Sequence, residues 1–160
     1  MPIFDNEFVD VDVFKYKDWE LIRLDRIPVQ RKFSGSLKII STNSEWKQAV
    51  CLRVLDKSKD GKLKMDFDSE EAKGFFLWEH LFYDRKDEPI LFKGTTKKME
   101  LIVYNAWGTT DWIGNKRTDC WTGGAAMIVE INGNTRKYRC NDGHPDDNFD
   151  DIIFEVTIDE

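Results

Sequence analysis

Apolar and polar residues alternate along most of this chain, and turn-forming residues interrupt the alternation about every ten positions. A period of two is typical of strands that bury one face, and here β-branched and aromatic residues fill the apolar positions. Many short strands with hardly any helix predict an all-β fold, an antiparallel β-sandwich of the jelly-roll or Greek-key kind. The strands are expected at residues 7–16, 19–29, 36–41, 49–55, 62–67, 89–92, 98–105, 125–131, 135–140 and 152–158.

Neither a repeat of fixed period nor a Pro- or Ser-rich linker divides these strands, so we predict one domain over residues 1–160. The segment 132–134, Asn-Gly-Asn, lies between two alternating runs and is a strong hairpin signal. The best helix candidate is residues 69–76, because Asp68 or Ser69 can cap it and acidic residues fill its first turn. We expect at most this one short helix.

Residues 56–67, DKSKDGKLKMDF, follow the pattern of an EF-hand calcium loop in their first half. Asp56, Ser58 and Asp60 occupy the first, third and fifth positions, and a glycine follows at the sixth. The twelfth position, however, is Phe67 instead of a bidentate Glu, and no helices are expected on either side. We therefore interpret this segment as a hairpin turn between two strands.

The composition is that of an ordinary folded protein, with 41% hydrophobic and 34% charged residues. No apolar run reaches the roughly 20 residues that a membrane-spanning helix needs. The acidic amino terminus lacks the basic and apolar segments of a signal peptide, which predicts a cytoplasmic protein or one exported by a non-classical route. Three cysteines without a C-x-x-C pair predict reduced, mostly buried thiols, with a Cys120–Cys140 disulfide as the alternative.

Acidic charge is concentrated at one end of the chain. The net charge is −6, yet residues 141–160 hold eight acids and no Lys or Arg, while the first 140 residues hold 22 acids against 24 bases. Binding to nucleic-acid phosphates needs a basic face, so this distribution argues against a nucleic-acid partner.

The sequence offers little support for catalysis. Only two histidines occur, His80 and His144, and we expect His80 to be packed and hydrogen-bonded within a run of aromatic residues. No nucleophile elbow, zinc-protease motif or phosphate-binding glycine loop is present. We predict a binding protein instead of an enzyme, and keep a glycan-cleaving pair of carboxylates as an alternative.

The segment with the most distinctive chemistry is residues 141–154, NDGHPDDNFDDIIF. Five aspartates and two asparagines fall between Asn141 and Asp151, and Gly143 and Pro145 exclude a helix. Because the expected strands on both sides hold these carboxylates close together, a hard dication would relieve their repulsion. Ca²⁺ accepts about six to eight oxygens in flexible geometry and suits the segment best, whereas Mg²⁺ needs a stricter octahedron and Zn²⁺ prefers His or Cys. An acidic turn without metal is the alternative.

Three stretches of residues 98–158 follow one another in a recognisable order: LIVYNAW at 101–107, GAAMIVEI at 124–131, and the Asn-Asp, acidic loop and Phe-x-Val ending at 141–156. Through them this half of the chain resembles the LecA-type galactophilic lectins of bacteria, small β-sandwiches in which Ca²⁺ bridges protein and sugar. The resemblance implies a galactose-binding-like sandwich that binds carbohydrate through Ca²⁺. The loop at 112–121 is shorter than the family's and lacks its His and Gln, so the sugar stays open.

The same resemblance, carried over by position, implies a set of metal ligands. Asp142 stands at the bidentate-type position, and the carbonyl of Thr110 or Asp111 comes from the first loop. One family asparagine falls on Phe149, which has no ligating side-chain atom, so Asn148 or Asp147 is expected to replace it. The implied metal ligands are Asp142, Asp146, Asn148, Asp150 and Thr110.

A bound sugar also needs aromatic rings and hydrogen-bonding groups beside the metal, since the C–H faces of sugars pack on rings. The candidates for these contacts are Asp111, Trp112, Trp121, His144 and Asp147. Alternatively, Trp112 and Trp121 pack over the end of the sandwich and His144 faces solvent. Trp107, next to an apolar strand, is expected in the core.

Residues 146–154, DDNFDDIIF, are also similar to the D-x-D-F-N-D-V-V-F loop of calcium-binding domains in bacterial surface proteins. That resemblance implies Ca²⁺ on Asp146, Asn148, Asp150 and Asp151, and adhesion instead of sugar recognition. Two functions therefore stay open. One is a calcium-dependent, lectin-like module, whose avidity a homo-oligomer would raise; the other is a protein-interaction or toxin-like sandwich with a structural calcium loop.

Overall fold

The computed structural model describes residues 13–16, 19–67, 70–83, 85, 88–110, 116–120, 126–142 and 148–160. Its secondary structure consists almost entirely of strands in antiparallel pairings, with one short helix, α1 (His80–Tyr83). The expected all-β sandwich is confirmed. No helix within these ranges is long and apolar enough to cross a membrane.

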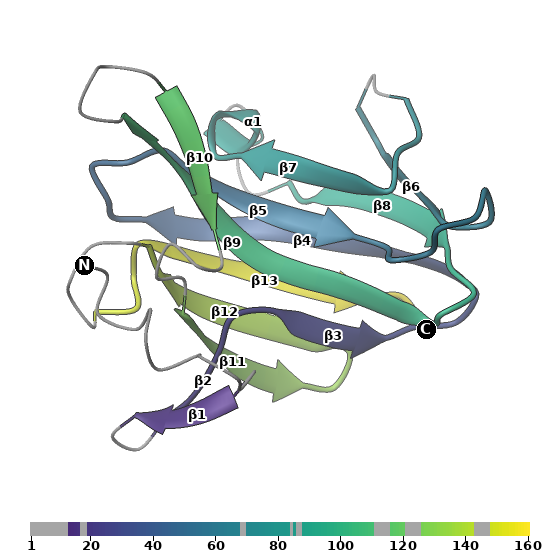
Figure 1. The fold of residues 1–160 in the computed structure, drawn as a ribbon, viewed down its shortest axis with the longest axis horizontal. Helices are drawn as coiled ribbons and strands as arrows, with labels where there is room; N and C mark the ends of the chain where they lie inside the picture. Colours follow the sequence, from purple (N-terminus) through teal and green to yellow (C-terminus); the bar gives the residue numbers. More distant parts are fainter. Residues whose placement is uncertain are drawn as a thin grey trace.

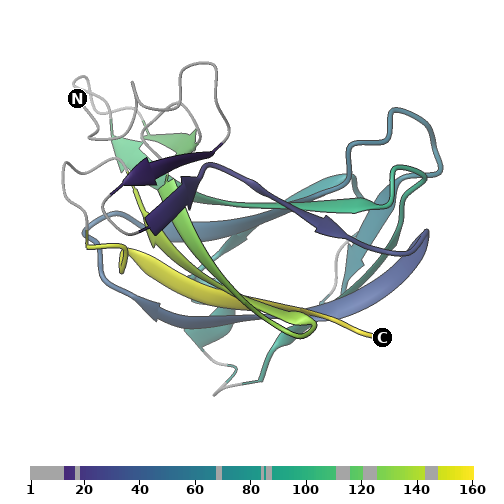
Figure 2. The ribbon, with the colours of Figure 1, turned by 90° about the horizontal axis from the view of Figure 1, so that it is seen from below.

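The strands form two sheets, which Figure 2 shows as two layers. The larger sheet has the order β1-β2-β11-β12-β13-β4-β8-β6. Its strands are β1 (Val13–Tyr16), β2 (Trp19–Ile22), β11 (Ala126–Asn132), β12 (Thr135–Asn141), β13 (Ile152–Ile158), β4 (Lys32–Thr42), β8 (Ile90–Thr95) and β6 (Lys62–Met65). The smaller sheet has the order β10-β9-β5-β7, with β3 also paired to β9. Its strands are β10 (Lys116–Cys120), β9 (Glu100–Thr110), β5 (Gln48–Arg53), β7 (Gly74–Trp78) and β3 (Asp25–Pro28).

The core lies between the sheets because each sheet turns an apolar face towards the other. Every second residue is buried from Ile152 to Val156 in β13, as the alternation predicts. In β5 all residues from Gln48 to Leu52 are buried, since this strand lies inside the smaller sheet. One continuous cluster of apolar side chains joins both sheets.

The hairpin predicted around residues 132–134 is confirmed. β11 and β12 pair as far as Asn132 and Thr135, which leaves Gly133 and Asn134 as a two-residue turn. Gly133 has φ 64°, and it occupies the first central position, where hairpins of type II′ place glycine.

Two other predicted elements are wrong. The strand expected at 19–29 is divided at Arg23 and Leu24 into β2, which joins the larger sheet, and β3, which joins the smaller. The helix expected at 69–76 is replaced from Gly74 onward by β7. The residues Phe-Phe-Leu-Trp at 75–78 favour a strand, and pairing with β5 overrides the capping signals that precede them.

The hairpin expected at 56–67 is also wrong. β5 pairs with β7 and β9, whereas β6 pairs with β8, so the connection at 54–61 crosses from the smaller sheet to the larger. Turn residues indicate where a strand ends, but they do not determine which strand the next one pairs with. In Figure 1 this crossing lies at the right, opposite the left-hand end where the chain passes from β12 to β13.

Candidate functional site

The acidic segment is the connection between two neighbouring strands. β12 and β13 are antiparallel partners, and their pairing ends at Cys140 and Ile152. The prediction that two apolar strands hold this segment at both ends is therefore confirmed. Residues 143–147, which include His144, Asp146 and Asp147, lie outside the described part of the chain.

Asp142 lies between the two sheets. Its side chain is 1% exposed, and its Oδ2 accepts hydrogen bonds from Ser44 Oγ at 2.5 Å and Gln48 Nε2 at 3.1 Å. Its backbone N–H donates to Asp151 Oδ2 at 2.9 Å. Gln48 begins β5 of the smaller sheet, whereas Asp142 directly follows β12 of the larger. The carboxylate thus fastens the start of the acidic segment to the opposite sheet.

A hydrogen bond between Asn141 and Phe149 joins the two ends of the acidic segment. Phe149 N–H donates to Asn141 Oδ1 at 2.7 Å, and Asn105 Nδ2 donates to the Asn141 carbonyl at 2.9 Å. Phe149 has φ 54°, an uncommon conformation for a large side chain. Its ring is buried against Leu21, and the ring of Trp19 meets it edge-on at 5.2 Å, so burial supports the strained backbone.

Asp150 and Asp151 return the chain to β13. Asn43 Nδ2 donates to Asp150 Oδ2 at 2.9 Å, and Asn43 N–H donates to the Asp151 carbonyl at 3.0 Å. Asp151 is buried, whereas Asp150 is only partly buried. An open polar recess lies over these residues, with walls formed by residues 42–45 and Asp151. Oxygen atoms therefore face both the interior and the solvent at this end of the sandwich.

Three buried oxygens of residues at this end of the sandwich have no hydrogen-bond partner among the described residues: Gln48 Oε1, Asn105 Oδ1 and Asp150 Oδ1. The register places Asn105 opposite Val50 and Gln48 two residues away along β5, so both amides lie on the face that looks towards the larger sheet. A buried oxygen without a donor costs about 1–3 kcal/mol unless a water or a cation meets it.

The donor set here is all oxygen, which suits a hard cation such as Ca²⁺ and not a soft one. Within the described ranges, however, no three His, Cys, Asp or Glu side chains converge as a metal site. The residues that could hold a cation are therefore the unpartnered oxygens together with the carboxylates at either end of the acidic segment.

The structure brings together some of the predicted site residues. Asp142 and Asp150 lie at the two ends of the same connection, and the side chain of Asn148 is exposed next to them. Thr110 ends β9 at its pairing with Lys116 of β10. The predicted residues outside the described part of the chain are Asp111, Trp112, Trp121, His144, Asp146 and Asp147.

The loop expected at 112–121 is partly wrong, because residues 116–120 form β10, which pairs with β9 along residues 106–110. The polar residues at 116–120 carry no alternation that would have predicted a strand. His80 is also unlike its prediction, since it is exposed on α1, a helix with no buried residue. Trp107 is in the core as predicted, with 1% of its surface exposed.

Ser44, Gln48 and Asn105 were not predicted as site residues. Asn105 interrupts the otherwise apolar run LIVYNAW, and Gln48 directly precedes the apolar run AVCL. An amide in a core strand needs a polar partner, so an amide within or directly beside such a run is the signal that could have identified both. Ser44 lies in a polar turn, where serine is too common to carry a comparable signal.

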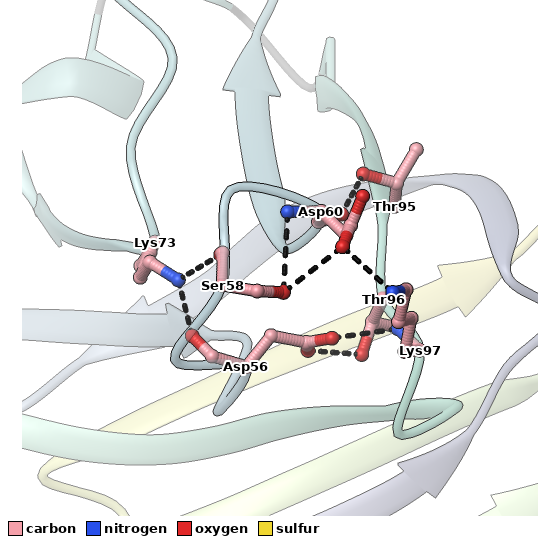
Figure 3. A network of polar contacts seen from close by, with 7 residues as sticks. All are labelled: Asp56, Ser58, Asp60, Lys73, Thr95, Thr96 and Lys97. Atoms are coloured by element: carbon pink, nitrogen blue, oxygen red, sulfur yellow. Dashed lines mark hydrogen bonds and ion pairs between the residues drawn. The ribbon is translucent and has the colours of Figure 1, made fainter.

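A second polar cluster occupies the crossing from β5 to β6, and Figure 3 shows how protein groups occupy its carboxylates. Asp56 Oδ1 accepts from Thr96 Oγ1 at 2.5 Å, and Asp56 Oδ2 accepts from Lys97 N–H at 2.7 Å. Asp60 Oδ2 accepts from Ser58 Oγ at 3.1 Å and pairs with Lys97 Nζ at 2.8 Å. The carboxylates in the EF-hand-like positions therefore hold a loop in place.

Lysine 73 completes this cluster, because Lys73 Nζ donates to the carbonyls of Asp56 and Ser58. Burial opposes ionisation of Asp56, but the hydrogen bonds from Thr96 and the Lys97 backbone outweigh it and hold the pKa of Asp56 below its ordinary value.

Cys51 and Cys140 are buried thiols, and neither forms a disulfide. The alternative Cys120–Cys140 bridge is therefore wrong, because Cys140 lies within the apolar core. Burial, and then the nearby Asp151 carboxylate, raises the pKa of Cys140 well above its ordinary value. This thiol is unreactive at neutral pH.

No protein-family model matches this chain, and neither does any curated protein or solved structure. The resemblances drawn from its motifs thus stay predictions.

Proposed function

We propose that this protein is a calcium-dependent carbohydrate-binding module whose site lies where β12 passes into β13. The observation that carries the proposal is the set of buried oxygens on Gln48, Asn105 and Asp150 that have no hydrogen-bond partner in the described part of the chain. Together with the carboxylates of the acidic segment, they supply the oxygen ligands that Ca²⁺ takes. When bound, Ca²⁺ would neutralise these carboxylates and offer open coordination positions to sugar hydroxyls.

The solvent side of this end supports binding of a sugar. Asn148 is exposed and Asp150 is half-buried, so ligands on this side reach solvent. The ring of Trp19 is 38% exposed and packs on Phe149, which fixes an aromatic surface beside the acidic segment. Sugars present C–H faces that pack on such rings, while their hydroxyls reach polar groups at the edge.

The second candidate is a protein-interaction sandwich in which Ca²⁺ only orders the acidic segment. The burial of Asp142 favours this candidate, since a cation on that carboxylate would be out of reach of an external sugar. Hydrogen bonds from Ser44 and Gln48 to the same carboxylate also give it a structural role.

The test is thermal unfolding of the chelated protein with and without millimolar CaCl₂, on the wild type, Asp150→Ala and Glu160→Ala. At 100 times the dissociation constant, Ca²⁺ should stabilise the wild type by about 2.7 kcal/mol, which is about 5–10 °C for a chain of this size. Asp150→Ala should lose most of this increase. Glu160→Ala, which removes an exposed acid at the carboxyl terminus, should keep it.

A glycan array with CaCl₂ or EDTA then separates the two candidates. Glycan binding that disappears with EDTA and with Asp150→Ala supports the lectin-like module. A calcium-dependent rise in the unfolding temperature without glycan binding supports the structural calcium loop. The absence of any calcium effect on the wild type contradicts both.

A further inference from the structure

The outer face of the larger sheet has two halves, and charged residues are arranged differently in each. Across β11, β12, β13 and β4 the register places Glu130 opposite Lys137, Lys137 opposite Glu155, and Glu155 opposite Lys38. Each directly facing pair combines opposite charges, an arrangement that stabilises a sheet. This half of the face is internally neutralised.

The corner formed by β4, β8 and β6 is different. Lys64 of β6 lies directly opposite Lys93 of β8, and Lys32 and Lys62 both lie opposite Thr95 of β8. Alternate residues share a face, so the four lysines lie together on the outer side, and all are exposed. Like charges placed directly opposite one another destabilise a sheet. The stability of the sheet therefore does not explain why these lysines lie together.

Three acidic residues line the same corner, and each contacts a neighbouring side chain. Glu71 pairs with Lys62 at 3.4 Å, whereas Asp66 pairs with Arg85 at 3.2 Å. Asp159, from the end of the chain, accepts a hydrogen bond from the Ser34 hydroxyl at 2.7 Å. Lys32, Lys64 and Lys93 make no ion pair with any residue that the structure describes.

The surface is also hollow at this corner. One cavity is lined by the four lysines together with Glu71. An adjoining cavity, lined also by Asp66 and Asp159, continues along β8 past Leu91 and Phe67. Both cavities share Lys64 and Lys93, so they form one groove. We call this the lysine groove: Lys32, Lys62, Lys64 and Lys93 with the surface between them.

We propose that the lysine groove binds a linear anionic polysaccharide that carries sulfate or carboxylate groups. The lysines span two rows of residues about 6.7 Å apart and three strands about 4.8 Å apart, a spread that fits several charges in a row better than a single small anion. The site lies on a different face from the proposed calcium site and does not depend on it.

Other polyanions fit the groove less well. A planar membrane surface does not enter a concave groove. Among the residues that line it, Phe33 and Phe92 are buried and Phe67 is half-buried, so it offers no exposed ring on which nucleic-acid bases stack. An acidic peptide added as a strand would need the edge of β6, where Leu63 already exchanges hydrogen bonds with Ala72 at 2.6 and 2.9 Å.

The test measures binding of fluorescent dextran sulfate at several salt concentrations, with EDTA present so that calcium plays no part. The wild type should bind dextran sulfate and not neutral dextran. The variant Lys64→Gln with Lys93→Gln should bind about tenfold more weakly, and its dependence on salt should fall by about one counterion per lysine removed. The control Lys38→Gln with Lys137→Gln removes the same charge from the neutralised half of the face and should bind within about twofold of the wild type.

Folding of the variants is checked by thermal unfolding, and the groove variant should unfold at or above the wild-type temperature because it loses a facing pair of like charges. Equal losses of affinity in both variants would overturn the proposal. Tighter binding of polyglutamate, a DNA oligonucleotide or anionic vesicles than of dextran sulfate would overturn the choice of ligand. A failure here leaves the calcium experiment unaffected, since the two use different variants and conditions.

Discussion

Single carboxylates take different roles in this molecule according to the donors around them. Asp56 is 5% exposed, and both of its oxygens accept hydrogen bonds from the segment that follows β8. Asp150 has one oxygen bonded to Asn43 and one buried oxygen without a partner among the described residues. The spacing of acids along the chain is similar in the two loops, so only the surrounding donors separate a structural carboxylate from a candidate ligand.

For Asp56 we predict a stability effect that depends on pH. Asp56→Asn leaves one acceptor oxygen where the carboxylate accepts from both Thr96 and the Lys97 N–H, and it removes the charge that strengthens these hydrogen bonds, so the variant should be less stable at pH 7 by about 1–3 kcal/mol. The pKa of Asp56 in the folded protein is below its ordinary value of 3.8. The stability that the ionised carboxylate contributes is therefore complete above pH 3.8, and it disappears as the pH falls through the folded-state pKa.

Urea unfolding at pH 7 and near pH 3 measures this effect. The difference between the wild type and Asp56→Asn should shrink at the lower pH. The control is Asp60→Asn, an exposed acid in the same loop, which should cost much less at pH 7. A difference between the wild type and Asp56→Asn that does not change with pH would contradict the role of the ionised carboxylate.

At the scale of elements, β4 and β8 pack through two facing pairs of glycine and phenylalanine. Phe33 lies opposite Gly94, and Phe92 lies opposite Gly35. A Cβ atom on Gly94 would be 2.6 Å from the Phe33 ring and 2.6 Å from the Lys62 carbonyl. Each ring covers the glycine of the neighbouring strand, and the two rings meet edge-on at 6.4 Å. The close packing at this edge of the larger sheet therefore depends on the absence of a side chain.

We predict that Gly94→Ala destabilises the protein by about 1–3 kcal/mol, because the new methyl group meets backbone and a buried ring that cannot move easily. Urea unfolding gives the value. Gly74→Ala in β7 is the matched control, since its closest neighbour is the Arg53 side chain at 3.0 Å, which can move. Equal costs for the two substitutions would show that the facing rings at Gly94 play no special part.

At the scale of the whole molecule, β12 fastens the larger sheet to the smaller through polar contacts at both of its ends. Arg136 and Tyr138 of β12 both donate to Asp25 Oδ2 of β3, at 2.8 and 2.6 Å. At the other end of β12, Asn141 accepts from Asn105 of β9. The hydroxyl of Tyr138 is deep in the core, where burial and the Asp25 carboxylate raise the pKa of this tyrosine well above its ordinary value. Polar contacts thus fix how the two apolar faces meet.

We predict that Tyr138→Phe lowers the free energy of unfolding by about 1–2 kcal/mol. Asp25 would keep its contact with Arg136 but lose the hydrogen bond from the Tyr138 hydroxyl. The control is Tyr83→Phe. Tyr83 is 65% exposed, and its hydrogen bond to Glu79 raises its pKa to about 12. Guanidinium unfolding should show a smaller cost for this variant, since solvent replaces the lost partner. A Tyr138→Phe protein as stable as the wild type would mean that packing alone joins the sheets.

Features that depend on neighbours along the chain could be predicted from the amino-acid sequence. Alternation predicted most strands, and Asn-Gly-Asn predicted the turn between β11 and β12, because a period of two and a glycine at positive φ are local requirements. The position of the acidic segment between β12 and β13 was predictable for the same reason, since both strands border it directly.

Strand pairing and contacts between distant side chains, in contrast, are visible only in the folded molecule. Local signals at 19–29 and 56–67 do not reveal that the chain changes sheets there, because the choice of sheet depends on how whole apolar faces are buried. Gln48 and Asp142 are 94 positions apart, so no local pattern links them. The opposition of Lys64 and Lys93 likewise appears only in the register of β6 and β8. Contacts between distant segments form only when long loops close around a shared core. Loop closure depends on the whole folded chain and leaves no local pattern in the sequence.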